Sequence, residues 1–238
     1  MLSQKMFRAA FSLCLAAAAA LPLPGQESRT SGLLGTVKAG VYFSPTGAYS
    51  IEIPVLPDLG GAIKDTPNVA TFQDSYGLQV SVAAFAHDAT QKWELSTRGT
   101  KDYLIYFLGS IVLPDFRQVS PKTSVESASF QPDLMDGAVF AYILMPGGSL
   151  FELQDAFARP STPPVAKRGN LLFVKNGFTF VVSSELSERV TEGSSYKKTP
   201  AEEDQILRAR LVGIVKKMQF PAPATPKLAA PNGTRDTP

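Results

Sequence analysis

The chain has 238 residues, of which 44% are hydrophobic, and a formal net charge of +2. The first 25 residues contain Lys5 and Arg8 but no acidic residue, so without them the 23 basic residues fall to 21, equal to the 21 acidic ones. A neutral chain lacks the positive field that attracts nucleic-acid phosphates, and the composition argues against a nucleic-acid partner.

Residues 1–25 have the three-part pattern of a cleavable signal peptide. A positive start precedes an apolar run over residues 9–21, which ends in small residues and a Pro/Gly-broken stretch. The run is short for a membrane span. Cys14 follows Leu13, whereas a lipoprotein signal requires a small residue there, so lipidation is disfavoured. We expect an exported protein, periplasmic or secreted, without a stable membrane anchor after cleavage.

The cysteine and histidine content of the sequence excludes most kinds of catalytic and metal-binding site. Cys14 is its only cysteine and leaves with the signal, which excludes disulfides and thiolate ligands. His87 is its only histidine, which excludes a zinc site with two histidine ligands. No P-loop, HExxH or GxSxG motif occurs. We therefore assign no catalytic residue, no metal ligand and no cofactor.

The first half of the mature chain predicts two β-hairpins. Residues 26–40 read as a flexible lead-in. A hairpin over 41–54 turns at Ser44–Gly47, where proline and glycine favour a turn, and its second arm alternates apolar and polar residues. Residues 55–67 are rich in proline and glycine and are expected to form a loop. A second hairpin covers 68–85, with apolar residues at every second position of its second arm.

The periodicity then changes to that of a helix. Apolar residues at 103, 104, 107, 108, 111 and 112 form one helical stripe over residues 100–112, which Pro114 is expected to end. Strands are predicted at Thr123–Phe130 and Ala138–Met145. A further hairpin joins 170–174 to 178–183 through Asn176-Gly177, a strong turn signal.

A second helix closes the domain. Thr199, Pro200 and Glu202 form a capping box with proline in the first turn. Residues 221–238 are rich in proline and alanine and are expected to be a disordered tail. The pattern predicts a single α+β domain over 41–220, with an antiparallel sheet of hairpins packed by helices on one or both faces.

The order of these elements resembles the PsbP/DcrB-like superfamily of envelope and thylakoid-lumen accessory proteins. The resemblance rests on the hairpin Tyr42–Pro54, on Phe72-Gln73-Asp74 before the strand at 78–82, on the hairpin at 170–183, and on Met218-Gln219-Phe220 at the end of the closing helix. It implies an α/β/α sandwich and a non-enzymatic accessory or binding role. It carries over no ligand residues.

Two groups of residues are candidate sites. His87-Asp88, after a strand, is the one place where histidine catalysis could occur, although a solvated surface loop is the simpler interpretation. The helical region also carries aromatic residues that could line a ligand or partner cleft, or belong to the core: Trp93, Tyr103, Tyr106 and Phe107.

The closing helix carries charges that admit two interpretations. Acidic residues in its first turn could be acid/base or metal-binding groups, but negative charge also suits a helix N-terminus. Basic residues further along could form a binding face or an ordinary solvated face. The acidic residues are Glu202, Glu203 and Asp204, and the basic ones are Arg208, Arg210, Lys216 and Lys217.

The leading hypothesis is an exported, non-enzymatic accessory protein that binds an envelope protein or a small molecule. The alternative is an envelope hydrolase that uses carboxylates rather than histidine or cysteine. A third hypothesis is an assembly factor that uses the proline-rich tail as a flexible tether. Converging carboxylates in a cavity would favour the hydrolase, and an exposed apolar patch would favour the interaction protein.

Overall fold

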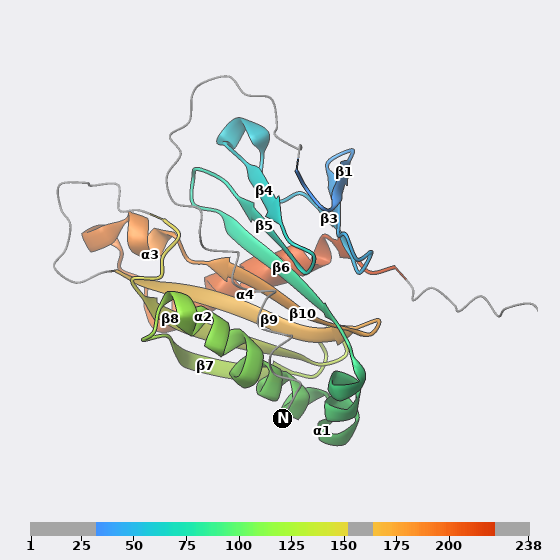
Figure 1. Cartoon of the computed structure of the whole chain (residues 1–238). Coiled ribbons are helices and arrows are strands. Elements are labelled where there is room, and N and C mark those ends of the chain that lie inside the picture. Colours follow the sequence, from blue (N-terminus) through green and yellow to red (C-terminus); the bar gives the residue numbers. More distant parts are fainter. Residues whose placement is uncertain (1–31, 152–163, 222–238) are drawn as a thin grey trace, which may run out of the picture.

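A computed structural model describes residues 32–151 and 164–221 and contains two antiparallel sheets. The larger has seven strands in the order β4-β5-β6-β10-β9-β8-β7 (Figure 1). The chain crosses over from β6, the third strand in this order, through the first helices to the far edge of the sheet at β7. The strands are β4 Ala62–Asp65, β5 Val69–Gln73, β6 Gln79–Ala86, β7 Ser124–Gln131, β8 Ala138–Pro146, β9 Val165–Lys175 and β10 Phe178–Glu185.

The smaller sheet has the order β1-β2-β3-β11. Its strands are β1 Thr36–Lys38, β2 Val41–Phe43, β3 Ser50–Glu52 and β11 Met218–Gln219. The expected hairpin over 41–54 is present as β2 and β3. Strand β1 lies inside the range 26–40 assigned to a flexible lead-in, so that boundary is wrong: Thr36–Lys38 pairs with β2 and satisfies its backbone groups there.

The helices lie on both faces of the seven-stranded sheet (Figure 1). On one face lie α1 (Ala89–Phe107), a π-helical segment (Leu108–Val112) and α2 (Leu113–Val119). On the other lie α4 (Pro200–Lys216) and the small sheet. Short helical turns complete the structure: Pro57–Leu59, α3 Glu188–Thr191 and Gly193–Ser195.

The sheet separates two apolar cores. Alternate strand residues such as Phe72, Val82 and Phe180 pack against α4 and the small sheet, whereas Ala83 and Val181 pack beneath α1 and α2. The helical stripe predicted from sequence supplies the second core through residues 103, 104, 107, 108 and 112, all buried.

Pro114 does not end the helix, contrary to expectation. It lies in the first turn of α2, where a missing N–H breaks no helical hydrogen bond. The π-helical segment before Pro114 accommodates the proline within a continuous helical region. Its hydrogen bonds are one residue longer than those of an α-helix, as the Leu113 N–H donates to the Leu108 carbonyl, five residues back. The helical region is also longer than predicted. It begins after Asp88, whose carboxylate and the Gln91 side chain form a capping box.

Strand β4 lies in the segment predicted to be a loop. It pairs with β5, with Lys64 opposite Thr71 and Ala62 opposite Gln73, and forms one edge of the large sheet. The Asp65 carboxylate at its end accepts hydrogen bonds from the Tyr42 hydroxyl (2.8 Å) and from two backbone N–H groups ahead of β1. This carboxylate therefore joins the two sheets and holds β4 in place.

The predicted α+β class with antiparallel hairpins and helices is confirmed. The predicted signal peptide (1–25) and all but the first residue of the predicted tail (221–238) lie outside the described residues. Within the described ranges, no helix combines the length and apolarity needed to cross a membrane.

Candidate ligand-binding site

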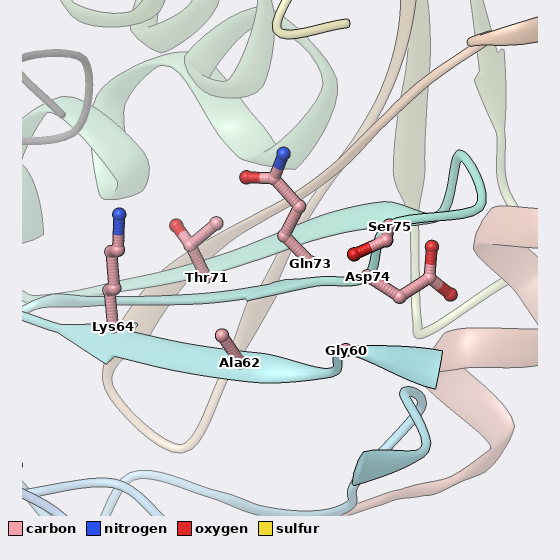
Figure 2. A pocket seen from close by; sticks show the side chains of 7 residues that line it. All are labelled: Gly60, Ala62, Lys64, Thr71, Gln73, Asp74 and Ser75. Carbon is pink, nitrogen blue, oxygen red and sulfur yellow. The ribbon is translucent and has the colours of Figure 1, made fainter. Parts of the chain in front are cut away.

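A polar cavity of about 250 Å³ lies on strands β4 and β5 and on the loops at their ends. Thr71 and Gln73 share the sheet face on which Val69 packs beneath α1. The described helices leave this face of β4 and β5 uncovered (Figure 1). Figure 2 shows Lys64, Thr71 and Gln73 projecting from the same side of the two strands. The cavity is lined by Gly60, Ala62, Lys64, Thr71, Gln73, Asp74 and Ser75.

A chain of hydrogen bonds runs from the cavity into the sheet. Thr71 Oγ1 lies 3.1 Å from Ser81 Oγ, and Gln79 Nε2 donates to the same Ser81 oxygen at 2.7 Å. Gln79 is 2% exposed, and no group in the described ranges donates to its Oε1. A buried amide oxygen without a donor is unusual, because nothing compensates for its desolvation.

Two loops form one end of the cavity. The Ser75 N–H donates to the Leu59 carbonyl (3.1 Å), which ties the loop before β4 to the β5–β6 turn. Gly60 adopts φ +73°, and a Cβ there would collide with Ser75 Oγ unless that side chain moved, so this position favours glycine. Both loops present exposed apolar side chains beside the polar cavity: Leu56, Leu59 and Tyr76.

The same sheet face carries a buried ion pair further from the edge. Arg168 Nη2 lies 3.1 Å from Glu185 Oε2. The Glu185 carboxylate also accepts hydrogen bonds from Ser149 Oγ (2.5 Å) and the Leu150 N–H (3.1 Å). These donors satisfy the carboxylate within the fold, so we assign the pair to holding the chain after β8 against the sheet.

A second ionic cluster lies on the opposite face, where β9 meets the start of α4. Lys167, whose side chain is fully buried, contacts Glu126 (2.5 Å), Glu203 (3.1 Å) and Asp204 (2.7 Å). Arg189 Nη1 donates to both oxygens of Glu203 at 2.7 Å. Burial alone would lower the pKa of Lys167, but its hydrogen bonds to Asp204, Glu126 and Glu203 outweigh the effect of burial and raise that pKa above its usual value.

This cluster contains the carboxylates that could have indicated a hydrolase. Glu203 and Asp204 converge on a lysine ammonium rather than on a cavity, and Glu202 closes the predicted capping box with Thr199. In the described part of the chain, no group of three or more His, Cys, Asp or Glu residues could hold a metal ion. The first-turn carboxylates therefore anchor and cap α4.

The basic residues of α4 are partly engaged by the domain itself. The Arg208 guanidinium lies 4.5 Å from the centroid of the Phe140 ring and donates to Gln131. Arg210 donates to the Glu185 carbonyl and to Glu188. Lys216 is exposed, and Lys217 pairs with the exposed Glu52. These side chains do not form one free basic face.

The four aromatic residues predicted as a possible cleft divide into two pairs. Tyr103 and Phe107 are buried in the core beneath α1, with ring centroids 6.0 Å apart. Trp93 is 61% exposed, and Tyr106 lies under the Arg98 guanidinium at the surface. Only the latter pair is accessible to a partner. That these residues bind one stays a prediction.

His87 is half-buried and engaged with the core. Its Nε2 lies 2.8 Å from Thr179 Oγ1, which in turn lies 2.7 Å from the Tyr103 hydroxyl. Burial lowers the pKa of His87, Lys92 lowers it further, and Asp88 partly opposes them. This arrangement differs from the solvated loop favoured by the sequence, because Thr179 is fully buried and reaches the imidazole from β10.

The cavity residues were not predicted as a site from the sequence. Strand β4 lies between proline and glycine residues, and its four residues are too few for an alternating pattern to stand out. A usable signal was present in β5, where Thr71 and Gln73 are the polar members of an alternating strand. Polar residues on both strands of an edge hairpin indicate a sheet face that is not packed into the apolar core.

No protein-family model and no curated protein sequence matches the chain. Solved structures are similar at the level of the fold. The Ran-binding protein Mog1p of Saccharomyces cerevisiae is 10% identical, covering 76% of this chain and 94% of its own, with a TM-score of 0.45. A protein from Bacteroides thetaiotaomicron is 12% identical, covering 78% and 49%, with a TM-score of 0.38.

The cyanobacterial PsbP protein CyanoP of Synechocystis is 13% identical, covers 80% of this chain and 99% of its own, and has a TM-score of 0.46. A PsbP protein is thus among the solved structures similar to this chain, as the resemblance in the sequence predicted. At these identities the similarity says nothing of ligands or partners.

Proposed function

We propose that this chain is an exported, non-enzymatic binding protein, and that the polar cavity on β4 and β5 is where it holds its ligand. The observation that carries the proposal is that Lys64, Thr71 and Gln73 project from one side of β4 and β5 and line a cavity, with the buried, donor-less Gln79 amide oxygen on the neighbouring strand β6.

The cavity volume bounds the size of the ligand. Pockets for drug-sized molecules measure roughly 300–1,000 Å³. About 250 Å³ therefore suits a small molecule or one end of a larger ligand. The neighbouring exposed Leu59 and Tyr76 supply apolar surface for a ligand that extends beyond the cavity.

A cavity-filling variant tests this proposal. Ala62 is exposed on edge strand β4 and lines the cavity, whereas Ala128 is exposed on the opposite edge strand β7. The full mature chain is titrated with succinate, glucose, lysine and triglycine while its amide NMR signals are followed. We expect at least one probe to shift the amides of β4 and β5, with loss of this effect in Ala62→Phe but not in Ala128→Phe. Equal responses in both variants would contradict the proposed site.

Export rests on the pattern of residues 1–25. Mass spectrometry of the protein from its native cells measures the mature N-terminus. Cleavage after Ala20 or near Gly25 supports export, whereas a retained Met1 or an acylated Cys14 contradicts this part of the proposal.

A further inference from the structure

We infer that the cavity on β4 and β5 binds a carboxylate group, carried by a small organic acid or by the C-terminus of a peptide. This inference rests on the proposed function and adds the ligand class to it. Its basis is the cross-strand pair of Lys64 and Thr71, which are directly opposite one another and project into the cavity from the same side. The Cβ atoms of such pairs lie roughly 4.5–5.5 Å apart, close enough for one ligand group to meet both side chains.

The hydrogen-bonded chain behind Thr71 allows its hydroxyl to donate into the cavity. The Gln79 amide nitrogen can only donate, so Ser81 Oγ accepts from it and has its own hydrogen available for Thr71 Oγ1, 3.1 Å away. With Ser81 as the donor of that bond, the Thr71 hydroxyl has its hydrogen available for the cavity. The hydroxyl donor and the Lys64 ammonium together match the two oxygens of a carboxylate.

The charges around the cavity favour a ligand with one negative charge. Lys64 forms no ion pair with any carboxylate in the described ranges and is the cation of the lining. Asp74 lies at the other end of the lining, where its Oδ1 accepts from the Tyr76 and Leu78 N–H groups of the turn. One cation and one anion leave the lining neutral, so a monocarboxylate fits better than a phosphate dianion.

The test uses four probes at constant ionic strength: propionate, the tripeptide Gly-Gly-Leu, its C-terminal amide, and inorganic phosphate. Affinities are measured by NMR titration of the full mature chain. We expect propionate and the free-acid peptide to shift the β4 and β5 amides, and the amidated peptide and phosphate to bind at least about tenfold more weakly. Similar affinities for propionate and the free peptide identify a small acid as the ligand. Tighter binding of the peptide identifies a C-terminus, whose leucine packs on the apolar loops.

Variants assign the effect to the two donors. Lys64→Gln and Thr71→Val should each weaken carboxylate binding by about tenfold, since each removes one hydrogen bond to a charged group. Thr71→Ser keeps the hydroxyl and should retain binding. Lys122→Gln, an exposed lysine just ahead of the far edge strand β7, is the matched control and should leave affinity unchanged.

The outcomes separate this inference from the proposed function. If the amidated peptide, glucose or phosphate shifts the cavity amides as strongly as propionate does, the carboxylate assignment is wrong and the binding site stands. If Lys64→Gln and Lys122→Gln weaken binding equally, the assignment to Lys64 is wrong. If no probe shifts the cavity amides, both the inference and the proposed function fail.

Discussion

Replacing Lys167 by methionine should destabilise the domain far more than replacing an exposed lysine. Methionine has a similar length and can occupy the buried position of Lys167, so the change removes the charge with little change in volume. Breaking a buried ion pair by removing one partner typically costs about 3–5 kcal/mol, because the remaining charge stays buried without compensation.

The surroundings of Lys167 place the expected loss at the lower end of that range. Glu203, nearly fully buried, keeps its two hydrogen bonds from Arg189. Glu126 and Asp204 have side chains 25% and 29% exposed, so water can solvate them once the lysine is gone. We therefore expect a loss of about 3 kcal/mol in the free energy of unfolding, equivalent to a fall in Tm of about 6–12 °C for a domain of this size.

Urea unfolding of wild type and Lys167→Met at neutral pH measures the loss. The matched control is Lys217→Met, because Lys217 pairs with Glu52 at 3.4 Å in an exposed position and should contribute less than about 1 kcal/mol. Unchanged m-values would show that the denatured state is not the source of the difference. A loss below about 1 kcal/mol in both variants would refute the argument that the Lys167 cluster anchors α4.

Three further predictions concern single positions: His87, Gly99 and Gly213. His87, the only histidine, should titrate below its usual pKa of 6.5 in an imidazole NMR titration. The unfolded chain then binds the proton more readily than the folded chain, so the free energy of unfolding should fall as pH drops below 6.5. His87→Gln should remove the part of this loss of stability that comes from His87. Gly99 interrupts α1 at φ +73°, ψ 166°, so Gly99→Ala should cost about 1–3 kcal/mol. Gly213 in α4 has no positive φ, and a Cβ added there would meet no other atom within 4 Å, so Gly213→Ala should raise stability by about 0.5–1 kcal/mol. Thermal melts of both glycine variants measure these changes, and losses of equal size at Gly99 and Gly213 would contradict the assignment.

The fold was largely predictable because its strongest signals are local. The Asn176-Gly177 turn, the alternation of β6 and the capping box at Thr199 each act within a few residues, and the structure has all three. Where a segment depends on distant residues, prediction failed. Strand β4 is held through Asp65 by Tyr42, 23 residues earlier. Strand β1 was missed although its partner β2 follows directly after Ala39-Gly40.

The candidate site was less predictable for the same reason. Lys64, Thr71 and Ser81 come from three strands, and only the register between those strands makes them neighbours. The buried ion pair of Glu203 was likewise not predictable from the sequence. The sequence explains its place in the first turn of α4 by the helix dipole, but its partner Lys167 lies 36 residues earlier, on β9.

A crystal structure of the mature chain grown with propionate would show whether the cavity on β4 and β5 is a ligand site. We expect a propionate carboxylate within hydrogen-bonding distance of both Lys64 Nζ and Thr71 Oγ1, and loss of that molecule in Lys64→Gln crystals. Propionate bound elsewhere on the protein, with water alone between Lys64 and Thr71, would contradict it.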